Sequence, residues 1–237
     1  MASRVPAEFD KFSDTYDDLL KDSIRDRFAA SGGAFFHGRK LDVLSEFLKG
    51  TGLDPSRLSL LDVGCGKGDF LKISVSSFHQ LTGCDPSEKM LREIDSASIS
   101  VRLQQSPTEV PYNSNEFDVL TAICVFHHVL PDARQKLCME MHRVLRPNGV
   151  MCLIEHNPFN PVTQIIVRRT PVDADAKLLT PNLSRRLARR AGFTVMHTQH
   201  FLYLPEMLYA RMGWLEKSLA MVPLGGQYAV FCRKADG

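Results

Sequence analysis

Residues 58–71 read L-S-L-L-D-V-G-C-G-K-G-D-F-L, and this stretch decides the fold. It opens with an apolar run that ends at Val63 and is short enough to predict a buried strand rather than a helix. Three closely spaced glycines follow, and the apolar spacing after them is typical of a helix start. A strand, a glycine turn and a helix N-terminus form the nucleotide-binding corner of an open α/β sheet. The glycines permit positive φ and let the backbone approach a ligand without a Cβ in the way.

The spacing of these glycines favours one kind of ligand. A dinucleotide-binding loop has the pattern G-x-G-x-x-G, whose third glycine eases packing of the helix against the strand. Here the glycines are Gly64, Gly66 and Gly68, and Asp69 takes the place of the third dinucleotide glycine. Because a carboxylate would repel a pyrophosphate, the loop is predicted to bind a ligand without phosphate. A nicotinamide-dependent oxidoreductase is kept as the alternative.

With Asp62 in front of it, the loop resembles the first motif of the class I S-adenosylmethionine (SAM) methyltransferases, acid-x-Gly-x-Gly-x-Gly. Later family motifs follow in order: an acid ending the second strand (Asp85), a Phe-Asp pair (117–118) and a leucine, basic, proline, glycine stop (145–149). Within the family, the resemblance is to the small-molecule, UbiE-like branch. It implies one domain over residues 1–237, with a Rossmann-like, doubly wound, seven-stranded α/β sheet. This sheet is expected to be mostly parallel, with one antiparallel strand near the C-terminus and helices on both faces.

The resemblance also implies which residues bind SAM and its product S-adenosylhomocysteine. Asp85 stands 23 residues beyond Asp62, at a strand end where an acid accepts hydrogen bonds from both ribose hydroxyls. Ser106 stands where family members usually carry an acid that binds the adenine amino group. Tyr16 matches a tyrosine that often touches the cofactor, although its apolar stripe is equally consistent with a core position. The full implied set is Tyr16, Asp62, Gly64, Cys65, Gly66, Gly68, Asp85, Pro86, Ser106, Pro107, Thr108 and Cys124.

Histidines and a carboxylate follow two neighbouring predicted strands, and they are the catalytic candidates. His127 and His128 come after the fourth strand, and Glu155 and His156 come at the end of the fifth. Ligands lie at the carboxyl ends of such strands, so a histidine base oriented by a carboxylate is predicted there, contributing roughly 10²–10⁴-fold in rate. Alternatively, one histidine caps a helix and the other packs. No residue set has metal-ligand spacing, so we predict no metal, with Mg²⁺-dependent catechol methylation as the exception.

Composition argues against several classes of protein. The 237 residues carry a formal charge of +2, and 24% of them are charged. This small net charge gives no strong positive potential that would attract nucleic acid. The six cysteines form no C-x-x-C pair and no zinc-like cluster with histidine, as expected for reduced core residues. The N-terminus lacks the apolar core of a signal peptide, and no uncharged apolar run approaches the ~20 residues of a membrane span. We therefore expect a cytoplasmic protein that binds no nucleic acid.

Three segments outside the matched motifs are predicted to cover the cavity and select the substrate. Residues 1–52 are predicted to be a helical lid that begins with a helix over 9–30. Residues 156–180 contain three prolines and little periodicity, which is typical of an insertion. Residues 202–224 include a predicted amphipathic helix over 205–222, interpreted as core or lid, with weak contact to a membrane surface left open.

The resulting functional prediction is methyl transfer from SAM to a small-molecule acceptor. A hydroxyl or amine of a secondary metabolite, quinone or sugar is favoured, with oxygen, nitrogen and carbon acceptors all open. Two alternatives are kept: a nicotinamide-dependent oxidoreductase and a SAM-binding protein without catalysis. The sequence makes no prediction of the oligomeric state.

Overall fold

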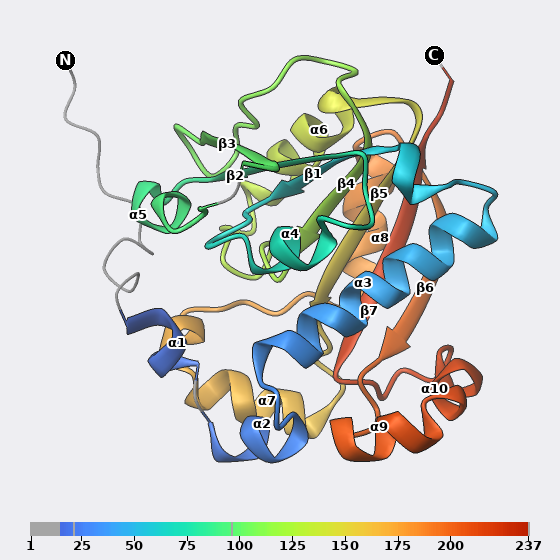
Figure 1. Cartoon of the computed structure of the whole chain (residues 1–237). Helices are drawn as coiled ribbons and strands as arrows, with labels where there is room; N and C mark the ends of the chain where they lie inside the picture. The colour runs from blue at the N-terminus through green and yellow to red at the C-terminus, as the bar shows by residue number, and fades with distance from the viewer. Residues whose placement is uncertain (1–14, 21, 96, 237) are drawn as a thin grey trace.

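The computed structural model describes residues 15–20, 22–95 and 97–236, and in this part of the chain one sheet dominates (Figure 1). Its seven strands run in the order β3-β2-β1-β4-β5-β7-β6. β7 pairs antiparallel with β5 and β6, and the other neighbouring pairs are parallel. The predicted Rossmann-like topology is confirmed. The strands are β1 (Ser59–Val63), β2 (Gln80–Asp85), β3 (Ile99–Leu103), β4 (Phe117–Ile123), β5 (Leu145–His156), β6 (Phe193–Phe201) and β7 (Gln227–Lys234).

β1 lies in the interior of the sheet, and all five of its residues are buried. The short 3₁₀ helix η3 (Pro55–Arg57) leads into it. From β1 the chain runs outward through β2 to β3 and then returns to β4 on the other side of β1. An open α/β sheet binds ligands at such a switch point, in the crevice outside the carboxyl ends of the strands. The topology therefore directs the search for a site to the ends of β1 and β4.

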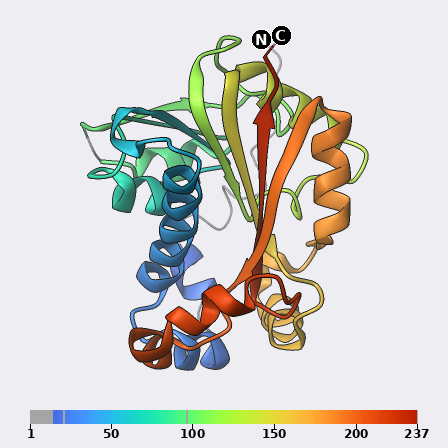
Figure 2. The same ribbon diagram turned by 90° about the vertical axis from the view of Figure 1, so that its right-hand side faces the viewer.

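Helices cover both faces of the sheet, as predicted (Figure 2). Apolar side chains of α3, α4 and α5 pack against one face, and those of α6 and α8 pack against the other. Strands covered on both faces are expected to be rich in apolar residues, which explains the run that precedes the glycine loop. The helices are α3 (Gly33–Gly50), α4 (Asp69–Ser74), α5 (Glu88–Arg92), α6 (Arg134–Val144) and α8 (Pro181–Arg190).

A second group of short helices gathers at one end of the sheet, below the strands in both views (Figures 1 and 2). They come from the three segments that the sequence sets apart as covers. These helices are α1 (Tyr16–Leu19), α2 (Ser23–Phe28), α7 (Pro161–Arg169), η4 (Pro171–Asp173), α9 (Glu206–Met212) and α10 (Trp214–Leu219). No helix in the described part of the chain has the length and apolar character needed to cross a membrane.

Two of the predicted long helices are interrupted. The helix expected over 9–30 begins outside the described residues, and its remainder is α1 and α2, because Asp22 starts a new helix. The Asp22 carboxylate accepts hydrogen bonds from the N–H groups of Ile24 and Arg25, at 2.8 and 3.2 Å. The helix expected over 205–222 is α9 and α10, which meet at Gly213.

One predicted helix start and one predicted turn also need correction. The sequence predicts a helix over 86–95 with Pro86 in its first turn, but α5 begins at Glu88, because the Ser87 hydroxyl caps it by accepting from the Met90 N–H at 3.2 Å. The turn predicted at 146–149 lies within β5 as a bulge. Leu145 pairs with Phe117 and Val150 with Val119, so the residues between them are extra on one strand.

Candidate functional site

The glycine loop closes the end of β1 in a backbone conformation that glycine favours. Gly64, Gly66 and Gly68 have φ of 73°, 53° and 73°. The N–H of Gly64 donates to the Cys84 carbonyl at 2.8 Å, which ties the loop to β2. A Cβ on Gly64 would lie 2.6 Å from Cγ2 of Val125, so the close approach also requires glycine.

Asp85 stands at the end of β2 and faces the same crevice. One carboxylate oxygen accepts from the Gly66 N–H at 2.9 Å, and the other accepts from the Ser87 N–H at 2.7 Å. These bonds fix the carboxylate relative to the loop. Because each carboxylate oxygen can accept more than one hydrogen bond, Asp85 fits the predicted role of binding a pair of hydroxyl groups.

Asp62 and Lys40 form a buried pair of ionisable groups below the loop. Burial raises the pKa of Asp62 to about 7, although the Thr121 hydroxyl, which donates to this carboxylate at 2.7 Å, and the charge of Lys40 oppose the rise. Burial likewise lowers the pKa of Lys40, on α3. Sequence reasoning missed Lys40, because a single lysine on an amphipathic helix gives no sign that it is buried.

A cavity of about 630 Å³ joins the glycine loop to the histidine cluster. Of the predicted cofactor residues, Gly68 and Thr108 do not line it, and the side chain of Tyr16 lies outside the described part of the chain. Gln104 also lines the cavity, and the sequence did not single it out. The predicted cofactor residues that do line the cavity are Asp62, Gly64, Cys65, Gly66, Asp85, Pro86, Ser106, Pro107 and Cys124.

Cys124 directly follows β4 and lies at the wall of this cavity in a strained conformation. Its φ is 56°, which is uncommon for a residue with a side chain. Its N–H donates to the Ile154 carbonyl at 2.8 Å, and the Gln227 amide donates to its sulfur at 3.4 Å. His127 and His128 come shortly after this turn, and both line the cavity.

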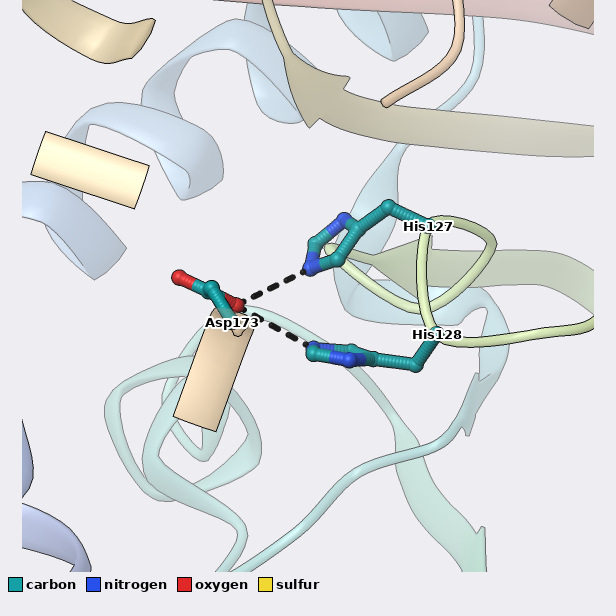
Figure 3. A group of neighbouring side chains, drawn as sticks. All are labelled: His127, His128 and Asp173. Atoms are coloured by element: carbon teal, nitrogen blue, oxygen red, sulfur yellow. Dashed lines mark ion pairs between the residues drawn. The ribbon is translucent and has the colours of Figure 1, made fainter. Parts of the chain in front are cut away.

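His127 is held between the carboxylates of Glu155 and Asp173, which come from different elements; Figure 3 shows Asp173 beside the two histidines. Its Nδ1 lies 2.6 Å from Oε2 of Glu155, on β5, and its Nε2 lies 3.4 Å from Oδ1 of Asp173, on η4. Nε2 of His128 lies 3.4 Å from the same Asp173 oxygen. The ring centroid of His156 is 5.3 Å from that of His127. The structure therefore brings the four predicted catalytic residues together and adds Asp173.

Glu155 lies behind the cluster rather than on the cavity wall. Its side chain is fully buried, and its second oxygen accepts from the Phe126 N–H at 2.8 Å. His127, His128, His156 and Asp173 line the cavity itself. Asp173 was missed because the segment that carries it has no periodicity to place it; its only signal is an acid in an insertion next to a histidine pair.

Charges in the cluster are strongly coupled. Burial opposes the charged form of His127, but the carboxylates of Glu155 and Asp173 prevail and raise its pKa to about 10. Burial and the charge of His127 lower the pKa of His156 to about 4, and burial also lowers that of His128. Despite its burial, hydrogen bonds from the two histidines lower the pKa of Asp173. At neutral pH, His127 therefore already carries the proton that a general base would have to accept.

Together, the glycine loop at the switch point, the acid ending β2 and the cavity between them define a nucleoside-binding protein of the doubly wound α/β class. Comparison with known proteins narrows this class. Residues 61–153 match the model of a methyltransferase domain family. A demethylmenaquinone methyltransferase of Staphylococcus aureus is 38% identical over 113 residues, which are 44% of this chain and 46% of that protein.

One further sequence relative and one solved structure are similar to this chain. The tRNA (carboxymethyluridine(34)-5-O)-methyltransferase of Arabidopsis thaliana is 29% identical over 121 residues, which are 51% of this chain and 29% of the plant protein. The crystal structure of a SAM-dependent methyltransferase from Archaeoglobus fulgidus has a TM-score of 0.62 at 16% identity, covering 89% of this chain and 98% of that one. The chain spans less than half of the length of the Staphylococcus aureus protein and of the Arabidopsis thaliana protein. Residues 61–153 are therefore similar to SAM-dependent methyltransferase domains, and the described part of the chain has the fold of these enzymes.

Proposed function

We propose that the protein transfers a methyl group from SAM to a hydroxyl or amine of a small molecule inside this cavity. The observation that carries the proposal is that one cavity of about 630 Å³ is lined at once by the glycine loop, by Asp85 and by the histidine cluster. Small-molecule sites typically enclose about 300–1,000 Å³. The Staphylococcus aureus relative is named a demethylmenaquinone methyltransferase, and this name supports a small acceptor.

In this proposal, SAM lies against the glycine loop, with its ribose on Asp85 and its adenine toward Ser106 and Gln104. When bound, SAM supplies a methyl group made electrophilic by the sulfonium. The chain's own contribution is to hold the acceptor in line and exclude water, which can supply on the order of 7–11 kcal/mol. His128 and His156, whose lowered pKa values leave them neutral, are the residues that we propose receive a proton from the acceptor.

Binding of S-adenosylhomocysteine is expected to raise the melting temperature, whereas NAD(H) is expected to leave it unchanged. Asp85→Ala should weaken binding by about 1.5–3 kcal/mol, because a charge-assisted hydrogen bond is lost. Titration calorimetry measures this change, with Glu88→Ala, an exposed acid three residues on, as the matched control. Stabilisation by NAD(H) alone would favour the oxidoreductase alternative. Unchanged affinity in Asp85→Ala would show that the ribose binds elsewhere.

Turnover is expected to depend on the histidine cluster. His128→Ala should lower formation of S-adenosylhomocysteine at least tenfold on a hydroxyl acceptor while leaving cofactor affinity unchanged, as loss of proton transfer does. The assay uses a panel of phenols, quinols, sugars and amines, with tRNA included because of the plant relative. His79→Ala, at an exposed histidine, is the control. Cofactor binding without turnover on any acceptor would favour the non-catalytic alternative.

We also propose that residues 202–224 rest on an anionic membrane surface. Met207, Trp214 and Met221 are 77, 67 and 71% exposed, so these three side chains do not pack in the core. Exposed Arg211 and Lys217 accompany these side chains. Large apolar side chains with basic neighbours are the pattern of an interfacial helix. Tyr203, in the same segment, lines the cavity. A membrane under this segment would therefore bring acceptors dissolved in the lipid close to the cavity.

The protein is accordingly expected to co-sediment with vesicles containing phosphatidylserine. The double variant Met207→Ser, Trp214→Ser should lower the bound fraction severalfold, because it lacks the two apolar side chains that are proposed to enter the boundary between lipid headgroups and acyl chains. Met139→Ser, at a site that is 56% exposed on α6, should not change it. Equal binding by the double variant and the wild type would contradict the proposal, as would the absence of wild-type binding.

A further inference from the structure

We propose that His127, His128 and Asp173 form a binding site for a divalent transition-metal ion, with Zn²⁺ as the best match. This inference goes against the prediction from sequence, which found no residue set at ligand spacing. His127 and His128 are adjacent and follow β4, whereas Asp173, on η4, lies 45 or more positions further along the chain, so spacing rules do not identify the set. It does not depend on methyl transfer, because metal binding is measured without turnover.

The distances between the candidate ligand atoms support the proposal. Nε2 of His127, Nε2 of His128 and Oδ1 of Asp173 lie within 4.8 Å of one another, and the Asp173 oxygen is 3.4 Å from each nitrogen (Figure 3). This separation is longer than a well-formed N–H···O hydrogen bond of about 2.7–3.2 Å. It matches the separation of about 3.4 Å between two ligands that lie ~2.1 Å from a tetrahedral zinc ion.

The surroundings of His127 also resemble those of a metal ligand. Histidines that bind metals commonly donate their second N–H to a carboxylate, which fixes the tautomer and the ring orientation. Here Nδ1 of His127 lies 2.6 Å from Glu155, which is itself held by the Phe126 N–H. This arrangement presents Nε2 of His127 to Asp173 and His128. Two neighbouring carboxylates further favour a cation at this place.

The cluster leaves room for a fourth ligand. His127, His128 and Asp173 all line the cavity, where a catalytic zinc site would keep an open coordination position. If the proposed methyl transfer is correct, that position faces the acceptor, and an acceptor hydroxyl bound there would ionise more readily. With the metal bound, His128 would be a ligand, and His156 alone would receive the proton. The competing interpretation is an ion-pair network in which the protonated His127 bridges two carboxylates without any metal.

The test measures metal binding by the full chain after treatment with a chelator and dialysis. Titration with Zn²⁺ should give one site per chain, and Co²⁺ should give the intense visible absorption of a tetrahedral site. Asp173→Asn and His128→Ala should each weaken Zn²⁺ binding at least 100-fold. Glu155→Gln should weaken it roughly 10–100-fold, as loss of an orienting carboxylate does. Mg²⁺ should bind much more weakly, since it prefers oxygen ligands.

Two controls keep the outcome decisive. Asp175→Asn changes an exposed acid two residues from Asp173, and it should bind Zn²⁺ as the wild type does. S-adenosylhomocysteine affinity should persist in every variant, which separates loss of metal from misfolding and from failure of the proposed function. Absence of a wild-type Zn²⁺ site, or equal Zn²⁺ affinity in the wild type and Asp173→Asn, would overturn the proposal in favour of the ion-pair network.

Discussion

Glu216→Ala is expected to lower the free energy of unfolding by about 3–5 kcal/mol, the usual cost of removing one member of a buried ion pair. The Glu216 side chain is only 4% exposed, and Oε2 accepts from Nη2 of Arg39 at 2.9 Å. Oε1 accepts from the N–H groups of Tyr203 and Leu204, at 2.7 and 3.1 Å. Alanine would leave the buried Arg39 guanidinium and two partly buried N–H groups without this acceptor.

The same carboxylate joins α10 to α3, so its loss should loosen residues 202–224 as well. Arg39 also lies over the ring of Tyr209, 3.9 Å from its centroid, which ties α9 to the same point. Urea unfolding measures the change in stability, and hydrogen exchange of residues 202–224 measures the loosening. Glu46→Ala removes an ion pair with Lys217 in which both side chains are largely exposed, so it should cost far less than Glu216→Ala. If Glu216→Ala and Glu46→Ala lower the free energy of unfolding equally, Glu216 does not act as a buried partner of Arg39.

The parts of the site that the sequence predicts well are those fixed by local backbone geometry. Gly64, Gly66 and Gly68 adopt positive φ because the chain must turn directly from β1 into α4, and the pattern of three glycines records that need. Asp85 ends β2 as predicted, since a buried run followed by proline leaves little choice of boundary. Strand order then follows from the resemblance to the family.

The parts that the sequence did not predict depend on contacts between distant segments. Glu216 reads as a charge that interrupts an amphipathic helix, and only its approach to Arg39, 177 positions away, makes it a buried partner. Asp173 likewise acquires a role only where η4 meets the end of β4. His127 was predicted as a base from its place after β4, but its charge depends on both Glu155 and Asp173. Spacing along a chain does not encode such pairings.

Glu155→Gln should have a similarly large effect, and its size should depend on pH. At about pH 6 the loss of unfolding free energy is expected to be about 3–5 kcal/mol, because a fully buried carboxylate that faces an imidazolium at 2.6 Å becomes neutral. The pKa of His127 is raised from 6.5 to about 10 in the folded protein. Its pairing therefore stabilises the fold fully below about pH 6.5, and this stabilisation is lost as the pH rises through about 10.

The difference in unfolding free energy between the wild type and Glu155→Gln should accordingly shrink between pH 6 and pH 10. Urea unfolding in metal-free buffer at a series of pH values measures this difference at each point. His127→Gln removes the imidazolium itself, so it should abolish the same pH dependence while leaving the Phe126 N–H bonded to Glu155. A difference that stays constant over this pH range would mean that His127 is neutral when folded. The cluster would then hold two carboxylates without a fixed counter-charge, an arrangement that requires a bound cation to be stable.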